Sequence, residues 1–179
     1  MTSADATVFV VDDDTSVRTA LKRLIQSLGF KVETFDSAQT FLKHGPHDGP
    51  ACLVLDVRMP GISGMDLLEI LCDRGTTLKT IILTGHGDVP MAVRAMNQGA
   101  FYFLQKPVNG PQLVSKVQEA LTASRETYEQ QRKLTTLQER FKQLTPRERQ
   151  VIELVIEGNT NKVISSKLHI VERTVEVHR

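Results

Sequence analysis

The sequence predicts an α/β fold, a doubly wound five-stranded parallel sheet, followed by a helical linker and a small all-α segment. Two observations support this prediction. Five short apolar runs alternate with amphipathic stretches in the first two thirds of the chain, as in parallel sheets whose strands are joined by helices. The remainder lacks such runs and carries helix-capping signals instead. We therefore divide the chain into domains at 1–123, 124–143 and 144–179.

The expected strands are apolar runs of four residues, and the helices between them have apolar residues every three to four positions. Gly29 ends the first helix, Pro60-Gly61 breaks the chain after the third strand, and Gly99 ends the fourth helix. The strands are Val8–Val11, Val32–Phe35, Cys52–Leu55, Thr80–Leu83 and Phe101–Leu104; the helices contain Val17–Leu28, Ala38–Leu42, Met65–Leu71 and Met91–Met96.

The last third is predicted to be helical. No Pro or Gly interrupts the chain between Pro111 and Pro146, and the charged stretch after Ser124 has a sparse apolar stripe suited to a connecting helix or a short coiled coil; a solvated linker is the alternative. Thr145, Pro146 and Glu148 form a capping-box pattern. Three short helices are expected, from Pro146 to about Glu157, from Asn161 to Leu168 after a Thr160 cap, and from about Glu172.

Charge and composition argue against several classes of protein. A net charge of +1 argues against a protein that binds polyanions over its whole surface, although the chain after residue 123 is more basic than the part before it. No apolar run is long enough to cross a bilayer, and the first residues lack a secretion signal, so a cytoplasmic protein without membrane contact is expected. Cys52 and Cys72 lie in apolar segments, which predicts buried free thiols.

The polar residues that concern us follow the first, third, fourth and fifth expected strands. Asp12 and Asp13 come after the first strand, Asp56 after the third, Thr84 after the fourth and Lys106 after the fifth. Taken singly, such residues are usually helix caps, turn formers or solvated charges. Because the carboxyl ends of parallel strands meet at one edge of a sheet, however, we expect these side chains to lie together in one crevice.

This set of residue types suits phosphoryl transfer. Crowded carboxylates repel one another unless a cation intervenes, and Mg²⁺ (or Mn²⁺) prefers oxygen ligands. With Asp56 as nucleophile, the metal and the Lys106 ammonium neutralise the charge that develops on the phosphoryl oxygens, and Thr84 donates its hydroxyl to one of them. The product is an acyl phosphate that can bias a two-state element.

Four stretches resemble the receiver domains of bacterial two-component response regulators: VVDDD (Val10–Asp14), LVLDVRMPGISG (Leu53–Gly64), ILTGHGDVPMAVRAMNQGA (Ile82–Ala100) and FLQKP (Phe103–Pro107). The resemblance is strongest to the FixJ-like branch, whose output domain is of the LuxR type. It implies a flavodoxin-like receiver fold and a regulator that is phosphorylated rather than an enzyme with an external substrate. A sensor histidine kinase would then be the phosphoryl donor.

The resemblance also implies roles for single residues. Asp12 and Asp13 match the acidic metal pair, Asp56 matches the phosphoacceptor, and the main-chain carbonyl of Arg58 matches a further metal ligand. Arg58 and His86 stand where the family tunes the lifetime of the acyl phosphate; simple exposure is the alternative for both.

Further positions match the family's switch. Thr84 and Phe103 would be the switch pair, with Phe103 turning inward once Thr84 moves, and Lys106 would precede a cis peptide bond at Pro107. Phosphorylation would reshape the face formed by the fourth helix and fifth strand and promote a homodimer.

The end of the chain resembles LuxR-type helix-turn-helix domains through LTPRERQVIELVIEG (Leu144–Gly158), TNK and RTVEVHR. Val163, His169 and Val171 depart from the residues usual in the family, Glu, Gly and a capping Ser. Measured against the family, Arg179 lies partway through the recognition helix, so an incomplete domain is expected. Val175 would face the core, and the candidate DNA contacts are Arg173, Thr174, Glu176, Val177, His178 and Arg179.

Two other functions remain open. An incomplete output domain would leave a receiver that acts only through protein contacts. Some phosphatases also use a nucleophilic Asp with Mg²⁺ on a similar sheet, but they resemble a motif with a second Asp two residues later, where this chain has Arg58.

Overall fold

The computed structural model describes residues 6–85 and 89–177. It divides into two compact units, Met1–Gln130 and Gln131–Arg179. No helix among the described residues has the length and apolar character needed to cross a membrane.

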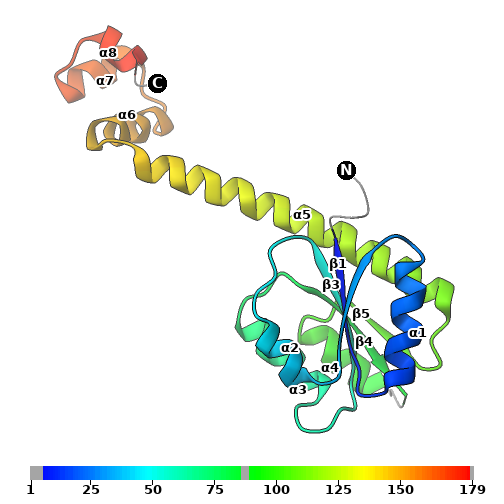
Figure 1. Cartoon of the computed structure of the whole chain (residues 1–179). Helices are drawn as coiled ribbons and strands as arrows, with labels where there is room; N and C mark the ends of the chain where they lie inside the picture. The colour runs from blue at the N-terminus through cyan, green and yellow to red at the C-terminus, as the bar shows by residue number, and fades with distance from the viewer. Residues whose placement is uncertain (1–5, 86–88, 178–179) are drawn as a thin grey trace. The chain divides into compact units, whose positions relative to one another are not determined.

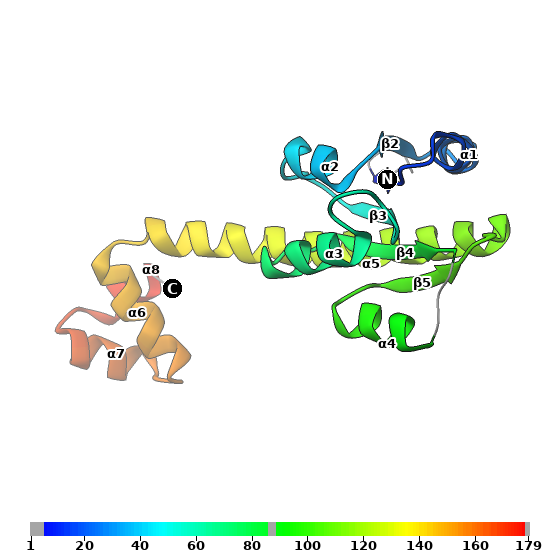
Figure 2. The ribbon, with the colours of Figure 1, turned by 90° about the horizontal axis from the view of Figure 1, so that it is seen from below.

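The first unit contains a five-stranded sheet in the order β2-β1-β3-β4-β5, in which all neighbouring strands are parallel. β2 and β5 form the two edges of the sheet (Figure 2). This topology confirms the doubly wound fold predicted from the sequence. The strands are β1 (Thr7–Val11), β2 (Lys31–Phe35), β3 (Ala51–Asp56), β4 (Lys79–Thr84) and β5 (Tyr102–Gln105).

Helices cover both faces of the sheet (Figure 1). Alternate residues of each strand point to opposite faces, so in β1 Phe9 packs with one core cluster and Val10 with the other. The first cluster contains residues of α2, α3 and α4, and the second contains residues of α1 and α5. These helices are α1 (Thr15–Gln26), α2 (Ala38–His44), α3 (Gly64–Asp73), α4 (Val89–Asn97) and α5 (Gly110–Gln143).

Several local predictions need correction. α1 begins at Thr15, because the Asp14 side chain caps it by accepting hydrogen bonds from the Ser16 and Val17 amides. Cys52 is buried as predicted, but Cys72 is exposed because it lies on the solvent side of α3.

α5 remains attached to the first unit beyond residue 123, where we predicted the domain boundary. The buried Ser124 hydroxyl accepts a hydrogen bond from the Ala51 amide at 3.0 Å, at the first residue of β3. One turn later, the Tyr128 hydroxyl donates to Asp48 Oδ1 at 2.8 Å. The early part of the predicted linker is therefore packed against the loop that precedes β3.

The second unit contains three short helices, α6 (Pro146–Ile156), α7 (Asn161–Leu168) and α8 (Glu172–Val177), close to the predicted bounds. The capping box between Thr145 and Glu148 is formed. Val151, Ile164 and Val175, one residue from each helix, form the buried core, so Val175 faces inward as predicted.

Two features of this unit depend on the residues that depart from the LuxR pattern. His169, at the end of α7, adopts a left-handed conformation with φ 53°, which Gly adopts at lower energy. α8 follows Val171, whose side chain has no acceptor for a free helix amide. In addition, Thr160 occupies the cap position of α7 but forms no side-chain cap hydrogen bond.

Candidate functional site

The site is built around the Lys106 ammonium, at the carboxyl edge of the sheet. Lys106 Nζ lies 2.6 Å from Asp56 Oδ1 and 2.7 Å from Asp12 Oδ2, so one cation joins both carboxylates. The two acids are nearly inaccessible to solvent, with relative exposures of 1% for Asp12 and 5% for Asp56. The structure therefore brings together three residues that lie far apart in the sequence.

The parallel register of the strands explains this convergence. Asp56, the last residue of β3, pairs with Leu83 of β4, and the next amide, that of Val57, donates to the Leu83 carbonyl at 3.0 Å. Thr84 ends β4, is fully buried, and accepts a hydrogen bond from the Lys106 amide through its carbonyl at 2.7 Å. The ends of three neighbouring strands are thus fixed to one another by backbone bonds.

The loop after β3 holds the Asp56 carboxylate in place. Asp56 Oδ2 accepts a hydrogen bond from the Arg58 amide at 2.6 Å, and the Gly64 amide donates to the Val57 carbonyl at 2.9 Å. A Cβ atom on Gly64 would lie 2.1 Å from the Asp56 carbonyl oxygen. Only glycine permits α3 to begin this close to the backbone of Asp56.

The loop after β1 orients Asp12. Its Oδ1 accepts from the Asp14 amide at 2.9 Å, and its main-chain carbonyl accepts from Arg18 Nη1 at 2.7 Å. Asp13 is exposed. Neither Arg18 nor Gly64 is among the residues that the sequence predicts for the site, because their roles depend on contacts made only in the folded chain.

Burial and neighbouring charges have opposite effects on the pKa values of Asp56 and Lys106. Burial raises the pKa of Asp56, an effect that the neighbouring Lys106 opposes and the Asp12 charge reinforces. Burial alone would lower the pKa of Lys106, but its hydrogen bonds to Asp12 and Asp56 outweigh this effect and raise the pKa. Lys106 is therefore a permanent positive charge at neutral pH.

The donor atoms fit a hard divalent cation. The inward-facing acids supply carboxylate oxygens, and Mg²⁺ is commonly held by one or two carboxylates together with waters and phosphoryl oxygens. Within residues 6–85 and 89–177, no group of three or more His, Cys, Asp or Glu side chains is arranged to hold a metal. The fit thus rests on Asp12 and Asp56, and Asp13 is not gathered with them into a three-acid cluster.

The remaining predicted residues of the first unit surround this centre. Phe103 in β5 is half-buried and packs against the core on the side of α2, α3 and α4. The Lys106–Pro107 peptide bond is cis, as the resemblance implies. The Arg58 side chain is exposed, and His86 lies outside the described residues.

The predicted DNA contacts are on or beyond α8. Arg173 and Glu176 are exposed and Thr174 is half-buried. The side chain of Val177 and all of His178 and Arg179 lie outside what the structure describes.

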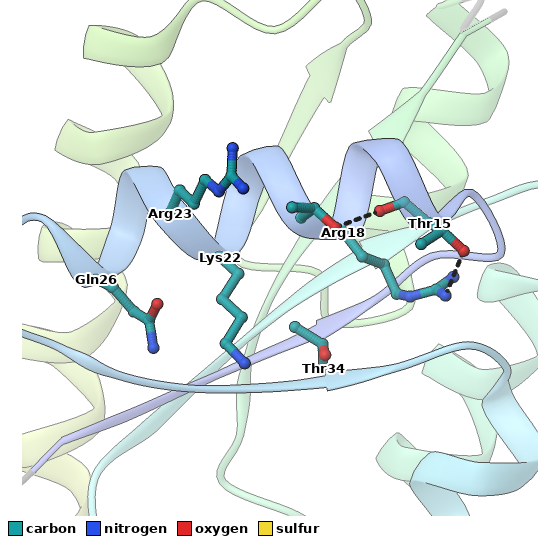
Figure 3. Close-up of a pocket in the computed structure, with 7 residues that line it drawn as sticks. Thr15, Arg18, Lys22, Arg23, Gln26 and Thr34 are labelled. Atoms are coloured by element: carbon teal, nitrogen blue, oxygen red, sulfur yellow. Dashed lines mark hydrogen bonds between the residues drawn. The ribbon is translucent and has the colours of Figure 1, made fainter.

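A pocket of about 420 Å³ beside α1 was not predicted. Lys22 and Arg18 extend from α1 on the same side as Thr34 of β2 (Figure 3). Arg18 connects this pocket to the site, because the same guanidinium binds Thr15 and the Asp12 carbonyl. All of the lining side chains can donate hydrogen bonds and none is acidic: Thr15, Arg18, Thr19, Lys22, Arg23, Gln26 and Thr34.

Each of the two units contains a segment that matches a known protein family. Residues 8–118 match the response regulator receiver domain, and residues 142–179 match the luxR family of bacterial regulatory proteins. Nodulation protein W of Bradyrhizobium diazoefficiens is 42% identical over 177 residues, covering 99% of this chain and 78% of that protein. The transcriptional regulatory protein FixJ of Azorhizobium caulinodans is 44% identical over 172 residues, covering 96% and 82%.

Two solved structures of response regulators are similar to nearly the whole chain. The response regulator StyR has a TM-score of 0.88 and 46% identity, covering 98% of this chain and 89% of that one. Full-length FixJ from B. japonicum has a TM-score of 0.63 and 39% identity, covering 98% and 87%.

Proposed function

This chain belongs to the response regulators that join a receiver domain to a LuxR-type helix-turn-helix domain, and on that basis we propose that Asp56 is its phosphoacceptor. The observation that carries the proposal is the Lys106 ammonium, held within 2.7 Å of two buried carboxylates at the carboxyl edge of the sheet. The donor is the phosphohistidine of a sensor kinase, and the activity belongs in the cytoplasm.

The transfer is a direct displacement. A carboxylate oxygen of Asp56 bonds to phosphorus while the phosphorus–nitrogen bond of the donor breaks, and the leaving imidazole keeps the electron pair and takes a proton from solvent. Lys106 offsets the charge on the phosphoryl oxygens, and the Arg58 amide orients the carboxylate through Oδ2.

A bound Mg²⁺ or Mn²⁺ would supply further neutralisation of the negative charge on the phosphoryl oxygens. Asp12 and Asp56 would hold it, with Asp13 and the Arg58 carbonyl as the further oxygens that the family resemblance implies. Thr84, buried at the end of β4, would donate its hydroxyl to the phosphoryl group.

Phosphorylation would be transmitted through β5 and α4. Phe103 is half-buried, so an inward rotation has a core to enter once Thr84 moves. The neighbouring α4 exposes three large apolar side chains, Val89, Val93 and Met96, spaced by four and three residues on one helix face. This exposed stripe supports α4 and β5 as the face on which two phosphorylated receivers pair.

The output of this switch is transcription control through α7 and α8. Arg173 and Glu176, both exposed on α8, are the described candidates for base or phosphate contacts. A gel-shift titration of the phosphorylated chain tests this step: salt-sensitive, sequence-selective binding supports it. Its absence favours a receiver that works through protein contacts alone.

Labelling with acetyl phosphate and Mg²⁺ tests the phosphoacceptor. The wild-type chain should gain one phosphoryl group by intact-protein mass spectrometry, and Asp56→Asn should gain none. Asp73→Asn is the matched control, because Asp73 is exposed at the end of α3 and should leave labelling unchanged. Labelling of Asp56→Asn at the wild-type level would refute the assignment.

A further inference from the structure

The far half of α5 carries an apolar stripe that the helix leaves uncovered. Every residue from 129 to 143 is exposed. Three of these residues are large and apolar: Leu134 and Leu137, each 59% exposed, and Phe141, 45% exposed. Their spacing of three and then four residues places them on one face of the helix. A solvated helical segment of this length is only marginally stable in water, so the stripe favours a partner.

We propose that Leu134, Leu137 and Phe141, the linker seam, form a parallel, in-register coiled coil with a second copy of this chain. A spacing of three and four residues corresponds to the a, d and a positions of a heptad repeat. A twofold axis brings the same stripe of both copies together, so the seam is complementary to itself. The proposal adds an interface to the phosphorylated dimer proposed above, and its phosphorylation dependence rests on that function.

The flanking charges select the parallel orientation. With Leu134 at position a, Lys133 and Arg140 occupy g positions, and Gln131 and Gln138 occupy e positions. An antiparallel pair sets g against g and would bring Lys133 close to Arg140 of the other copy, two like charges. A parallel pair sets g against e, so that Lys133 faces a glutamine.

Among the described residues, contacts from α6 cover the Phe141 end of the seam. The Arg149 guanidinium lies 5.6 Å from the centre of the Phe141 ring, and Arg149 Nη2 donates to the Lys142 carbonyl at 2.9 Å. These contacts hold Phe141 next to α6 but leave Leu134 and Leu137 exposed. Three apolar residues make a weak interface on their own. The seam therefore stabilises the dimer mainly once the receivers have paired and hold the two linker helices close together, at a high effective concentration.

Cysteine cross-linking of the full chain tests both the contact and its orientation. The exposed Cys72 is first changed to Ser, which removes the accessible native thiol. Leu134→Cys then places one thiol in the seam, and Thr136→Cys places a matched thiol on the opposite face of the same helix. Under mild oxidation we expect Leu134→Cys to form covalent dimers at least about tenfold faster, because only in-register parallel helices bring residue 134 of both copies within disulfide distance.

Equal rates for the two variants would overturn the proposal. Faster cross-linking in a mixture of Leu134→Cys and Leu137→Cys chains than in either chain alone would also overturn it, because an antiparallel helix pair sets a positions against d positions. Running each reaction with and without acetyl phosphate separates the two proposals. Cross-linking at residue 134 that does not respond to phosphorylation supports the seam and contradicts phosphorylation control of the dimer.

A charge substitution provides a second measurement. Leu137→Glu puts a carboxylate into the seam, and Thr136→Glu puts the same charge on the opposite face. Sedimentation equilibrium of the phosphorylated proteins should show a dimer dissociation constant roughly tenfold higher for Leu137→Glu than for Thr136→Glu. Equal dissociation constants, with normal labelling of Asp56 in both variants, would show that the seam does not form.

Discussion

Replacing Gly64 by Ala should damage the candidate site without touching any charged group. The added Cβ would lie 2.1 Å from the Asp56 carbonyl oxygen, 2.9 Å from the Asp56 carbonyl carbon and 2.9 Å from Val57 Cα. Normal contacts of this kind are about 3.5 Å or longer, so a shift of more than 1 Å is required. All three atoms belong to the backbone, so no side-chain rotation relieves the overlap.

The shift should be measurable in both stability and chemistry. Overpacking of this kind costs about 1–3 kcal/mol, and displacing a reacting group by about 1 Å can slow its reaction by on the order of a hundredfold. We expect a lower urea midpoint by circular dichroism at 222 nm. We also expect Asp56 to be labelled by acetyl phosphate about a hundredfold more slowly.

Gly110→Ala is the matched control, because the same substitution at the start of α5 creates only an ordinary contact, 3.8 Å from Leu24 Cδ2. It should leave the labelling rate unchanged. If Gly64→Ala unfolds and reacts like Gly110→Ala, then the close approach of α3 does not position Asp56, and the geometric account of the site is wrong.

Three further predictions concern individual contacts. Lys106→Met leaves two buried carboxylates without their shared cation and should lower the free energy of unfolding in urea by about 1–3 kcal/mol at neutral pH. Added Mg²⁺ should restore part of this loss. An unchanged urea midpoint would contradict the central role of the ammonium. Ser124→Ala leaves the buried Ala51 amide without its acceptor and should cost about 1–3 kcal/mol, whereas a cost below about 0.5 kcal/mol would mean that α5 is not anchored there. Asp66 accepts hydrogen bonds from the Ser63 hydroxyl and amide, which lower the pKa of Asp66 in the folded chain. The stability that this gives is complete above the ordinary Asp pKa and is lost as the pH falls through the folded pKa. Asp66→Asn should therefore flatten the acid side of the plot of unfolding free energy against pH, and a plot parallel to that of wild type would refute this.

Much of the fold follows from local sequence patterns. Continuous apolar runs predict buried parallel strands, and the described strands begin and end within one residue of the predicted bounds. Because the order of strands places their carboxyl ends at one edge, the sequence also predicts that Asp12, Asp56 and Lys106 meet.

Other features depend on side-chain directions that the sequence does not reveal. Cys72 has apolar neighbours, but α3 turns Leu68 and Leu71 inward and leaves Cys72 on its solvent side. From the sequence, Arg18 is expected to be a solvated surface charge. In the folded chain its Nη1 lies 2.7 Å from the Asp12 carbonyl oxygen. Gly64 is one of 11 glycines, and only the approach of α3 to β3 shows why it cannot carry a side chain.

The hydrogen bond from Ala51 to Ser124 has a mechanical consequence. β3 has the Ser124 anchor at its first residue and Asp56 at its last, so one strand connects the start of the linker with the proposed phosphoacceptor. Free-energy coupling between two sites is reciprocal. A ligand of the linker that changes phosphoryl binding at Asp56 by displacing α5 at Ser124 would have its own affinity changed by the same factor when Asp56 is phosphorylated.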